Sequence, residues 1–224
     1  MNPLRPSQLP SGLYALADDG VLPDTPVLQK ARWALEGGAS IVQVRLKRAT
    51  SREAVAICRE VVDLCRSRGV ACIVNDRVDW ALLSGADGVH LGQEDLPVQD
   101  ARRLLGPERL LGATVRSLED ALEAAKLGAD HVGLGPLFTT RTKSVDHPPL
   151  GLHGLQRVAE GSPIPVVAIA GIGLENISDV ARVGAHAAAV ASAFLQAADP
   201  VQRVRGLVAS FESGRAQRRI AGTP

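Results

Sequence analysis

The chain has 224 residues, of which 46% are hydrophobic, 22% charged and 3% aromatic, and its formal net charge is +1. This length fits one large domain of roughly 100 to 250 residues, and no linker-like stretch divides it. A near-neutral chain offers no field for nucleic acid, and no apolar run reaches the roughly 18 residues of a membrane span. We therefore expect no nucleic-acid partner and no membrane contact. Because the first residues lack the apolar segment of a signal peptide, we expect a cytoplasmic location.

Three cysteines stand at intervals of seven residues: Cys58, Cys65 and Cys72. An odd number at this spacing fits neither a disulfide framework nor the close pairs of a zinc site. The first two would share one face of a helix, which favours a role as small buried hydrophobic residues. We predict no thiolate metal site.

Short β-branched runs alternate with longer segments of helical periodicity, which is a βαβα order. The predicted strands cover 13–17, 41–46, 71–75, 88–91, 110–115, 131–135, 166–170 and 187–191. Glycines at 38, 85, 128 and 184 each stand between a predicted helix and a strand, where glycine suits the left-handed residue that ends a helix. Their spacings of about two βα units support eight units in all.

Eight units in some 200 residues predict the α/β class and a compact (β/α)8 TIM barrel. A doubly wound open sheet is the alternative, which the lack of Gly-x-Gly-x-x-Gly after the first strand disfavours. We assign residues 1–213 to a single barrel domain and expect 214–224 to form a disordered tail. Barrel enzymes build their active sites at the C-terminal ends of the strands, so we look there for chemistry.

The second predicted strand ends in three long polar side chains. Period two places Gln43, Arg45 and Lys47 on the face opposite Val42 and Val44. Inward polar groups at this end are costly without a partner, and Arg with Lys is the usual pair for a diphosphate. We predict an anion site here, with structural ion pairs between strands as the alternative.

Two acidic residues follow the next two strands. Asp76 ends the third strand and Asp95 lies just beyond the fourth, so both can reach the mouth of the barrel. Mg²⁺ prefers few carboxylates together with water and phosphate oxygens, which this arrangement could supply. The alternative is that each aspartate caps a helix or a turn.

The later strand ends carry weaker signals. The hydroxyl of Thr114 could reach a ligand or cap a helix, and Arg116 is equally open. Residues 137–150 form a loop longer than usual, either a lid or a solvated loop, which holds Thr140, Thr142 and Lys143. The segments after the last two strands could bind a phosphate through backbone N–H groups. No histidine has a serine or cysteine partner at a recognisable spacing, so we assign none a catalytic role.

Several blocks of the chain, taken together, resemble the thiamine phosphate synthase family from about Tyr14 to Asp199. The matching blocks are Gln-Val-Arg-Leu-Lys at 43–47, Asn-Asp-Arg-Val-Asp at 75–79, the segment 85–95, Gly-Leu-Gly-Pro at 133–136, Thr-Arg-Thr-Lys at 140–143 and Gly-Ile at 171–172. The resemblance implies a barrel enzyme, a transferase of thiamine biosynthesis. It would join a pyrimidine diphosphate to a thiazole phosphate and release pyrophosphate.

The resemblance also implies roles for individual residues. The pyrimidine diphosphate would be held by Gln43, Arg45, Lys47, Asn75, Thr114 and Lys143, and Mg²⁺ by Asp76 and Asp95. The thiazole phosphate would be held by Thr140, Thr142, Gly171, Ala191 and Ser192. Arg45, Lys47 and Lys143 would act in catalysis by neutralising the leaving pyrophosphate, and no general base is needed.

The chain departs from the family pattern at three positions, where many relatives have serine for Thr114, histidine for Arg116 and glycine for Ala170. Threonine keeps the hydroxyl, whereas Arg116 would add a cation near the diphosphate. Two alternatives stay open: a thiazole tautomerase-like barrel that does not couple its ligand, and a non-catalytic sensor of phosphate ligands. The partners in each case are small molecules, and we make no prediction of the oligomeric state.

Overall fold

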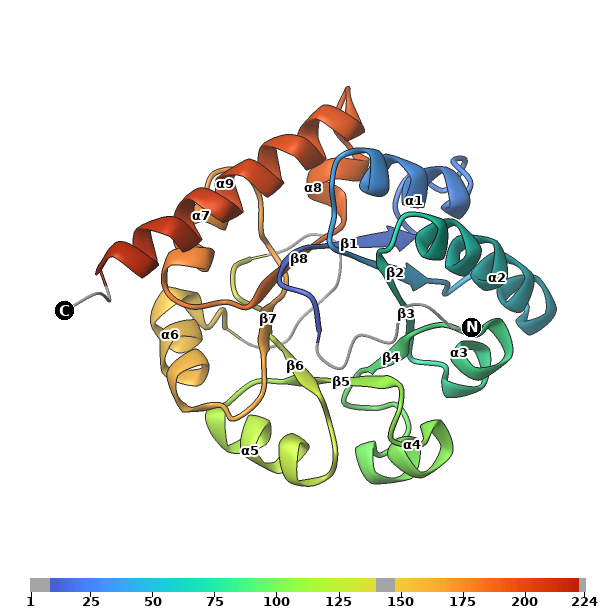
Figure 1. Ribbon diagram of the computed structural model, residues 1–224, viewed down its shortest axis with the longest axis horizontal. Coiled ribbons are helices and arrows are strands. Elements are labelled where there is room, and N and C mark those ends of the chain that lie inside the picture. Colours follow the sequence, from blue (N-terminus) through green and yellow to red (C-terminus); the bar gives the residue numbers. More distant parts are fainter. Residues whose placement is uncertain (1–8, 140–147, 222–224) are drawn as a thin grey trace.

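The computed structural model describes residues 9–139 and 148–221, in which eight parallel strands close into a barrel (Figure 1). Each strand pairs with the next along the chain, and β8 pairs with β1, so the predicted TIM barrel is confirmed. The strands are β1 Gly12–Asp18, β2 Ile41–Arg45, β3 Ala71–Asn75, β4 Gly88–Leu91, β5 Leu110–Val115, β6 His131–Leu134, β7 Val166–Ala168 and β8 Ala187–Val190.

Helices surround the strands (Figure 1). They are α1 Val27–Glu36, α2 Ser51–Ser67, α3 Val78–Ser84, α4 Val98–Leu105, α5 Leu118–Lys126, α6 Gly151–Gly161, α7 Ile177–Arg182, α8 Ser192–Leu195 and α9 Pro200–Ala221. Local sequence explains several starts: Thr50 caps α2 and Ser117 caps α5, each in a capping box with an acidic residue three positions on. The glycines at 38, 85, 128 and 184 all have positive φ, as predicted.

Two separate cores follow from the alternation of side chains along the strands. Val42 and Val44 of β2 point outward into the large core between strands and helices, which also holds the three cysteines as free, buried thiols. Tyr14, Ile41 and Ile73 point inward and fill the barrel. The outward and inward faces predicted for β2 are therefore confirmed, and the polar residues of its inward face lie at the open end of the barrel interior.

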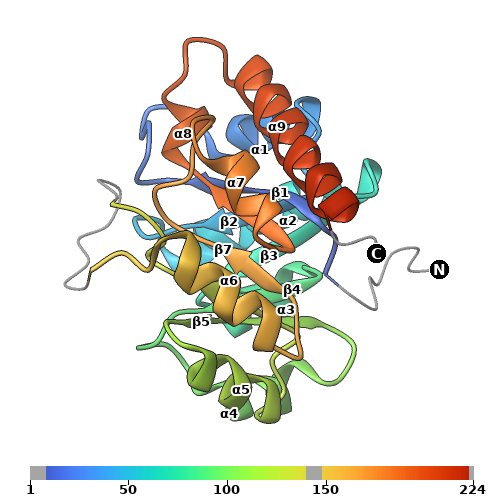
Figure 2. The ribbon, with the colours of Figure 1, turned by 90° about the vertical axis from the view of Figure 1, so that its left-hand side faces the viewer.

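The prediction of a disordered tail is wrong for residues 214–221, because α9 continues to Ala221. This helix packs along α7, and Figure 2 shows the two side by side. The reason is a close helix contact at Gly214, where a Cβ would overlap the carbonyl oxygen of Ser178 and stand 3.0 Å from the Cβ of Ala181. Tertiary packing thus stabilises a helix that its polar, glycine-containing sequence did not predict.

Within the part of the chain that the structure describes, no helix combines the length and the apolar character needed to cross a membrane.

Candidate active site

A cavity of about 580 Å³ opens at the C-terminal ends of the strands. Ten of the predicted site residues line it: Gln43, Arg45, Lys47, Asn75, Asp76, Asp95, Thr114, Gly171, Ala191 and Ser192. Thr140, Thr142 and Lys143, with most of the predicted lid, lie outside the described residues. The barrel therefore brings together every predicted site residue that the structure describes, from six strands or the segments that follow them.

The cationic side of the cavity is held in place by the end of β1. Arg45 Nη1 donates a 2.8 Å hydrogen bond to Oδ2 of Asp18, whose side chain is 2% exposed. The backbone N–H of Lys47 donates to the carboxylate of Asp19 at 3.0 Å. Asp18 at the end of β1 thereby fixes the side chain of Arg45, and Asp19 just beyond the strand fixes the backbone of Lys47. The alternative of a structural ion pair between strands is therefore present, and the anion site stays a prediction.

A buried lysine also holds the end of β1 in place. Lys30 of α1 is 0% exposed, and its Nζ donates a 2.8 Å hydrogen bond to the carbonyl oxygen of Asp18. Burial lowers the pKa of Lys30, while the nearby Asp18 and Asp19 carboxylates oppose that shift. The carbonyl of Asp18 is thus tied to α1 while its carboxylate holds Arg45.

The two predicted metal ligands lie side by side. Asp76 accepts a short hydrogen bond from Nζ of Lys47, and its backbone has φ of 63°, a left-handed conformation uncommon for aspartate. Burial, and then a side-chain hydrogen bond with Asp76, raise the pKa of Asp95. The alternative role in a turn also holds for Asp95, because its Oδ2 accepts from the backbone N–H of Gly92 at 2.7 Å.

Such a donor set fits Mg²⁺. A divalent cation would stabilise two neighbouring carboxylates, and Mg²⁺ completes its shell with phosphate oxygens and water. No cluster of three or more histidine, cysteine or acidic side chains occurs among residues 9–139 and 148–221, so a fully protein-coordinated site is not built there.

The floor of the cavity is polar. Gln43 Nε2 donates a 2.8 Å hydrogen bond to the hydroxyl of Tyr14, whose pKa burial raises, so the phenol stays neutral. Thr114 Oγ1 lies 3.0 Å from Nε2 of His90. Because Ser117 supplies the cap of α5, the capping alternative for Thr114 is wrong and its hydroxyl faces the cavity.

The ends of β7 and β8 form a tight, small-residue side. Gly171 has φ of 70°, and a Cβ there would stand 2.7 Å from the Cβ of Phe138. Asn176 holds the following turn by donating to the Gly171 carbonyl at 2.9 Å and accepting from the N–H of Gly173 at 3.0 Å. Binding of a phosphate by backbone N–H groups at these strand ends stays a prediction.

Comparison with known proteins decides the family. A family model described as thiamine monophosphate synthase matches residues 13–194. The chain belongs to the thiamine monophosphate synthase family. The resemblance inferred from the sequence blocks is confirmed, and the chain is an enzyme of thiamine biosynthesis in its general function.

Individual relatives of the thiamine monophosphate synthase family agree. The chain is 56% identical to the thiamine-phosphate synthase of Myxococcus xanthus over 213 residues, covering 95% of this chain and 97% of the relative. It is 50% identical to that of Anaeromyxobacter dehalogenans, covering 92% of this chain and 90% of the relative. The solved thiamine phosphate pyrophosphorylase of Pyrococcus furiosus superimposes with a TM-score of 0.83 at 40% identity, covering 91% and 96% of the two chains.

Sequence reasoning gave no role to three cavity residues that contact predicted site residues. Tyr14, Asp18 and His90 all line the cavity, and each bonds a predicted site residue. A signal was present, since Asp18 and His90 are polar residues at or near the ends of strands covered on both faces. Arg116, left open at the sequence level, also lines the cavity.

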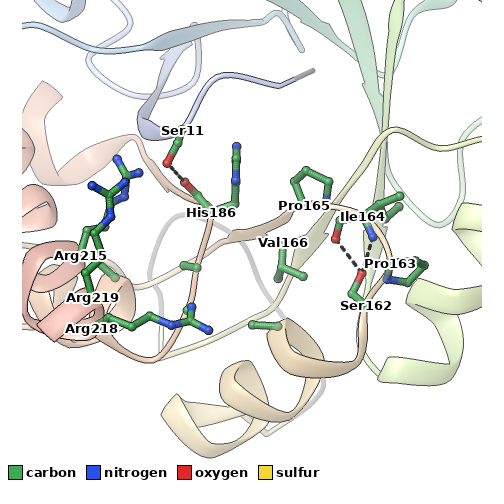
Figure 3. A pocket seen from close by; sticks show the side chains of 14 residues that line it. Ser11, Ser162, Pro163, Ile164, Pro165, Val166, His186, Arg215, Arg218 and Arg219 are labelled. Atoms are coloured by element: carbon green, nitrogen blue, oxygen red, sulfur yellow. Dashed lines mark hydrogen bonds between the residues drawn. The ribbon is translucent and has the colours of Figure 1, made fainter. Parts of the chain in front are cut away.

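A second cavity, of about 400 Å³, lies at the other end of the barrel (Figure 3). Figure 3 shows Arg215, Arg218 and Arg219 of α9 on one side of it and His186 and Ser11 beside them. It is built at the N-terminal ends of β1, β7 and β8, and it contains none of the predicted site residues. The candidate active site of this family member is therefore the cavity at the C-terminal end of the barrel.

Proposed function

We propose that this chain joins 4-amino-2-methyl-5-(diphosphooxymethyl)pyrimidine to a thiazole phosphate, giving thiamine phosphate and pyrophosphate. One observation supports this most: Arg45, Lys47, Asp76 and Asp95 line one cavity, where Lys47 pairs directly with Asp76. Cations for a diphosphate and carboxylates for its metal ion are the two needs of pyrophosphate release. The relatives named above carry the name thiamine-phosphate synthase or thiamine phosphate pyrophosphorylase.

We assign the residues to the two substrates as the resemblance implies. The pyrimidine diphosphate contacts Gln43, Arg45, Lys47, Asn75, Thr114 and Lys143, and the thiazole phosphate contacts Thr140, Thr142, Gly171, Ala191 and Ser192. The glycine turn after β7 and the start of α8 suit a monophosphate, because small residues let backbone N–H groups reach it. Such a reaction belongs in the cytoplasm, where we place the protein.

Asp76 and Asp95 would hold Mg²⁺ together with oxygens of the diphosphate. Bound there, the ion would supply Lewis-acid stabilisation of the charge that develops on the leaving pyrophosphate. The Lys47 ammonium, which bonds Asp76, lies where it can turn to the diphosphate when a divalent cation takes over that carboxylate.

In the reaction, the bond between the pyrimidine methylene carbon and the diphosphate oxygen breaks, and the thiazole nitrogen bonds to the same carbon. Arg45, Lys47 and Lys143 take up the negative charge of the departing pyrophosphate. The nucleophilic nitrogen carries no proton, so no general base is required. This agrees with His90, the histidine in the cavity wall, whose pKa burial lowers to about 4. Catalysis rests on positioning and electrostatics.

A pyrophosphate-release assay with both substrates and Mg²⁺, followed by mass spectrometry of the product, tests the proposal. Wild-type protein should give thiamine phosphate and pyrophosphate in equal amounts, and Asp95→Asn should lose most of this turnover. Asp100→Asn, on the exposed face of α4, is the matched control and should behave as wild type. Binding of either substrate by the wild-type protein without product would sink the proposal in favour of a sensor or a tautomerase-like barrel.

A further inference from the structure

Two histidines lie one against the other inside the barrel, beneath the cavity. His131 of β6 is 0% exposed and His90 of β4 is 9% exposed. Their ring centroids are 5.6 Å apart, and Nδ1 of His90 lies 3.5 Å from Nε2 of His131. The reaction described above uses neither ring, so two imidazoles in a barrel interior call for a physical account.

Glycines make the space for this pair. A Cβ at Gly112 of β5 would overlap His131 Nε2 and His90 Nδ1, and a Cβ at Gly133 of β6 would stand 2.8 Å from His90 Cε1. Inward positions of a barrel are usually filled by branched apolar residues. Two such inward positions are glycine here, Gly112 and Gly133, and the space they leave lets both rings fit between β4, β5 and β6.

The contacts form a line that ends at the cavity. His131 is next to His90, and His90 Nε2 lies 3.0 Å from Oγ1 of Thr114, which lines the cavity. At the other end, His131 Nδ1 is buried with no hydrogen-bond partner among the described residues. Burial lowers the pKa of both imidazoles, so each is neutral near pH 7 and carries one proton.

With one proton on each ring, the hydrogen bonds of this chain can be directed in two ways, from His131 toward Thr114 or from Thr114 toward His131. If His131 carries its proton on Nε2, it donates to His90 Nδ1; His90 then donates from Nε2 to Thr114 Oγ1, and the Thr114 proton is free to point into the cavity. In the reverse direction, Thr114 donates to His90, and His131 is left with a buried, unpaired N–H. Orphaned buried N–H groups are rare in folded proteins. The first direction avoids one.

We propose that His131 and His90 are positioning residues that hold the Thr114 hydroxyl as a hydrogen-bond donor to the anionic ligand of the cavity. This inference rests on the proposed function for the identity of that ligand as a diphosphate. A hydroxyl that already accepts from His90 presents its proton to a phosphate oxygen without first losing a competing bond. The bond to a charged acceptor is then worth more than one between neutral groups.

The tautomers can be observed without any substrate, in ¹⁵N-labelled full-length protein near pH 7, by long-range proton–nitrogen correlation of the histidine rings. We expect His90 and His131 both to carry the proton on Nε2. In His131→Leu, His90 should become a mixture of tautomers, because nothing then donates to its Nδ1. A wild-type His90 protonated on Nδ1, or a His90 tautomer unchanged by His131→Leu, would overturn the proposal whatever reaction the enzyme catalyses.

Calorimetric titration with inorganic pyrophosphate and Mg²⁺ tests the consequence for binding. Thr114→Val should bind pyrophosphate roughly tenfold to a hundredfold more weakly, as expected for losing a hydrogen bond to a charged group. His90→Met should weaken binding about tenfold, and His90→Gln, whose amide can still donate, should restore most of it. The double variant that combines His90→Met with Thr114→Val should bind pyrophosphate no more weakly than Thr114→Val alone.

His153→Gln, an exposed histidine on α6, is the matched control and should bind as wild type. Additive losses in the double variant would mean that His90 does not act through Thr114, and the proposal would fail. A wild-type protein that binds pyrophosphate and shows the expected tautomers but releases none from the pyrimidine diphosphate would refute the proposed function alone.

Discussion

Asp18 and Arg45 form an ion pair between the ends of β1 and β2, with 2.8 Å between the carboxylate oxygen and the guanidinium nitrogen. The carboxylate is buried and the guanidinium reaches the cavity, so the pair aims one cation at the place where the diphosphate is proposed to bind. The other carboxylate oxygen of Asp18 accepts from the N–H of Gly20 at 2.8 Å, which fixes the turn after β1.

Asp18→Asn removes the charge that holds Arg45 but keeps an oxygen for Gly20. We expect the KM for the pyrimidine diphosphate to rise about tenfold, and the free energy of unfolding to fall by about 1 to 3 kcal/mol because Arg45 loses its buried partner. Steady-state kinetics and urea denaturation measure the two effects. Asp63→Asn, which breaks an exposed pair with Arg66 on α2, should change neither. A KM unchanged in Asp18→Asn would show that Arg45 does not depend on Asp18.

Removal of divalent metal should stop the reaction. Asp76 and Asp95 lie together at the mouth as the proposed ligands of the ion, so we expect a chelator in excess to abolish pyrophosphate release and added Mg²⁺ to restore it. The assay also gives the Mg²⁺ concentration for half-maximal rate, which should rise at least tenfold in Asp76→Asn. Full turnover in chelator would contradict the metal assignment.

Two glycines of α9 should respond in opposite ways to alanine. A Cβ at Gly206 would stand 3.4 Å from the nearest Leu174 atom, an ordinary contact, so Gly206→Ala should stabilise the helix by about 0.5 to 1 kcal/mol. At Gly214 a Cβ would overlap the Ser178 carbonyl, so Gly214→Ala should destabilise by about 2 kcal/mol, as overpacking does. Thermal melting of both variants checks this. A more stable Gly214→Ala would mean that α9 does not pack on α7 this closely.

The three buried thiols should be unreactive in the native protein. Burial raises the pKa of Cys58 to about 12, and a side-chain hydrogen bond with Cys65, followed by burial, raises that of Cys72. At pH 8 we expect no reaction of native protein with a disulfide reagent such as DTNB, and three equivalents after unfolding in guanidinium. Rapid reaction of any thiol in the native state would contradict the buried assignment.

The same shift sets a pH dependence. An unfolded cysteine loses its proton near pH 8.5, whereas folded Cys58 keeps it up to about pH 12. Unfolding therefore releases a proton between these values, and the thiol's contribution to stability falls as pH rises through that window. Denaturation at pH 8 and pH 10 should show a smaller decrease for Cys58→Val than for wild type.

Much of the barrel was predictable from the sequence because its signals are local. Strands β3, β4 and β5 have the predicted bounds, and the others differ by one or two residues at their ends. The alternation in β2 alone separated Gln43, Arg45 and Lys47 from the outward valines, since successive side chains of a strand point to opposite faces. Ten of the thirteen predicted site residues line one cavity, and the other three lie outside the described residues.

What the sequence by itself determined was the order of elements, the inward polar face of β2 and the family blocks. Only the tertiary structure decided that Asp18 holds Arg45 and that Lys30 ties the end of β1 to α1. It likewise decided that His131 lies against His90 and that His90 lies against Thr114. It also decided that α9 continues past Gly214. These are contacts between residues distant in the chain, whose partners no local periodicity names. They form only when closure of the barrel brings strand ends and helices together.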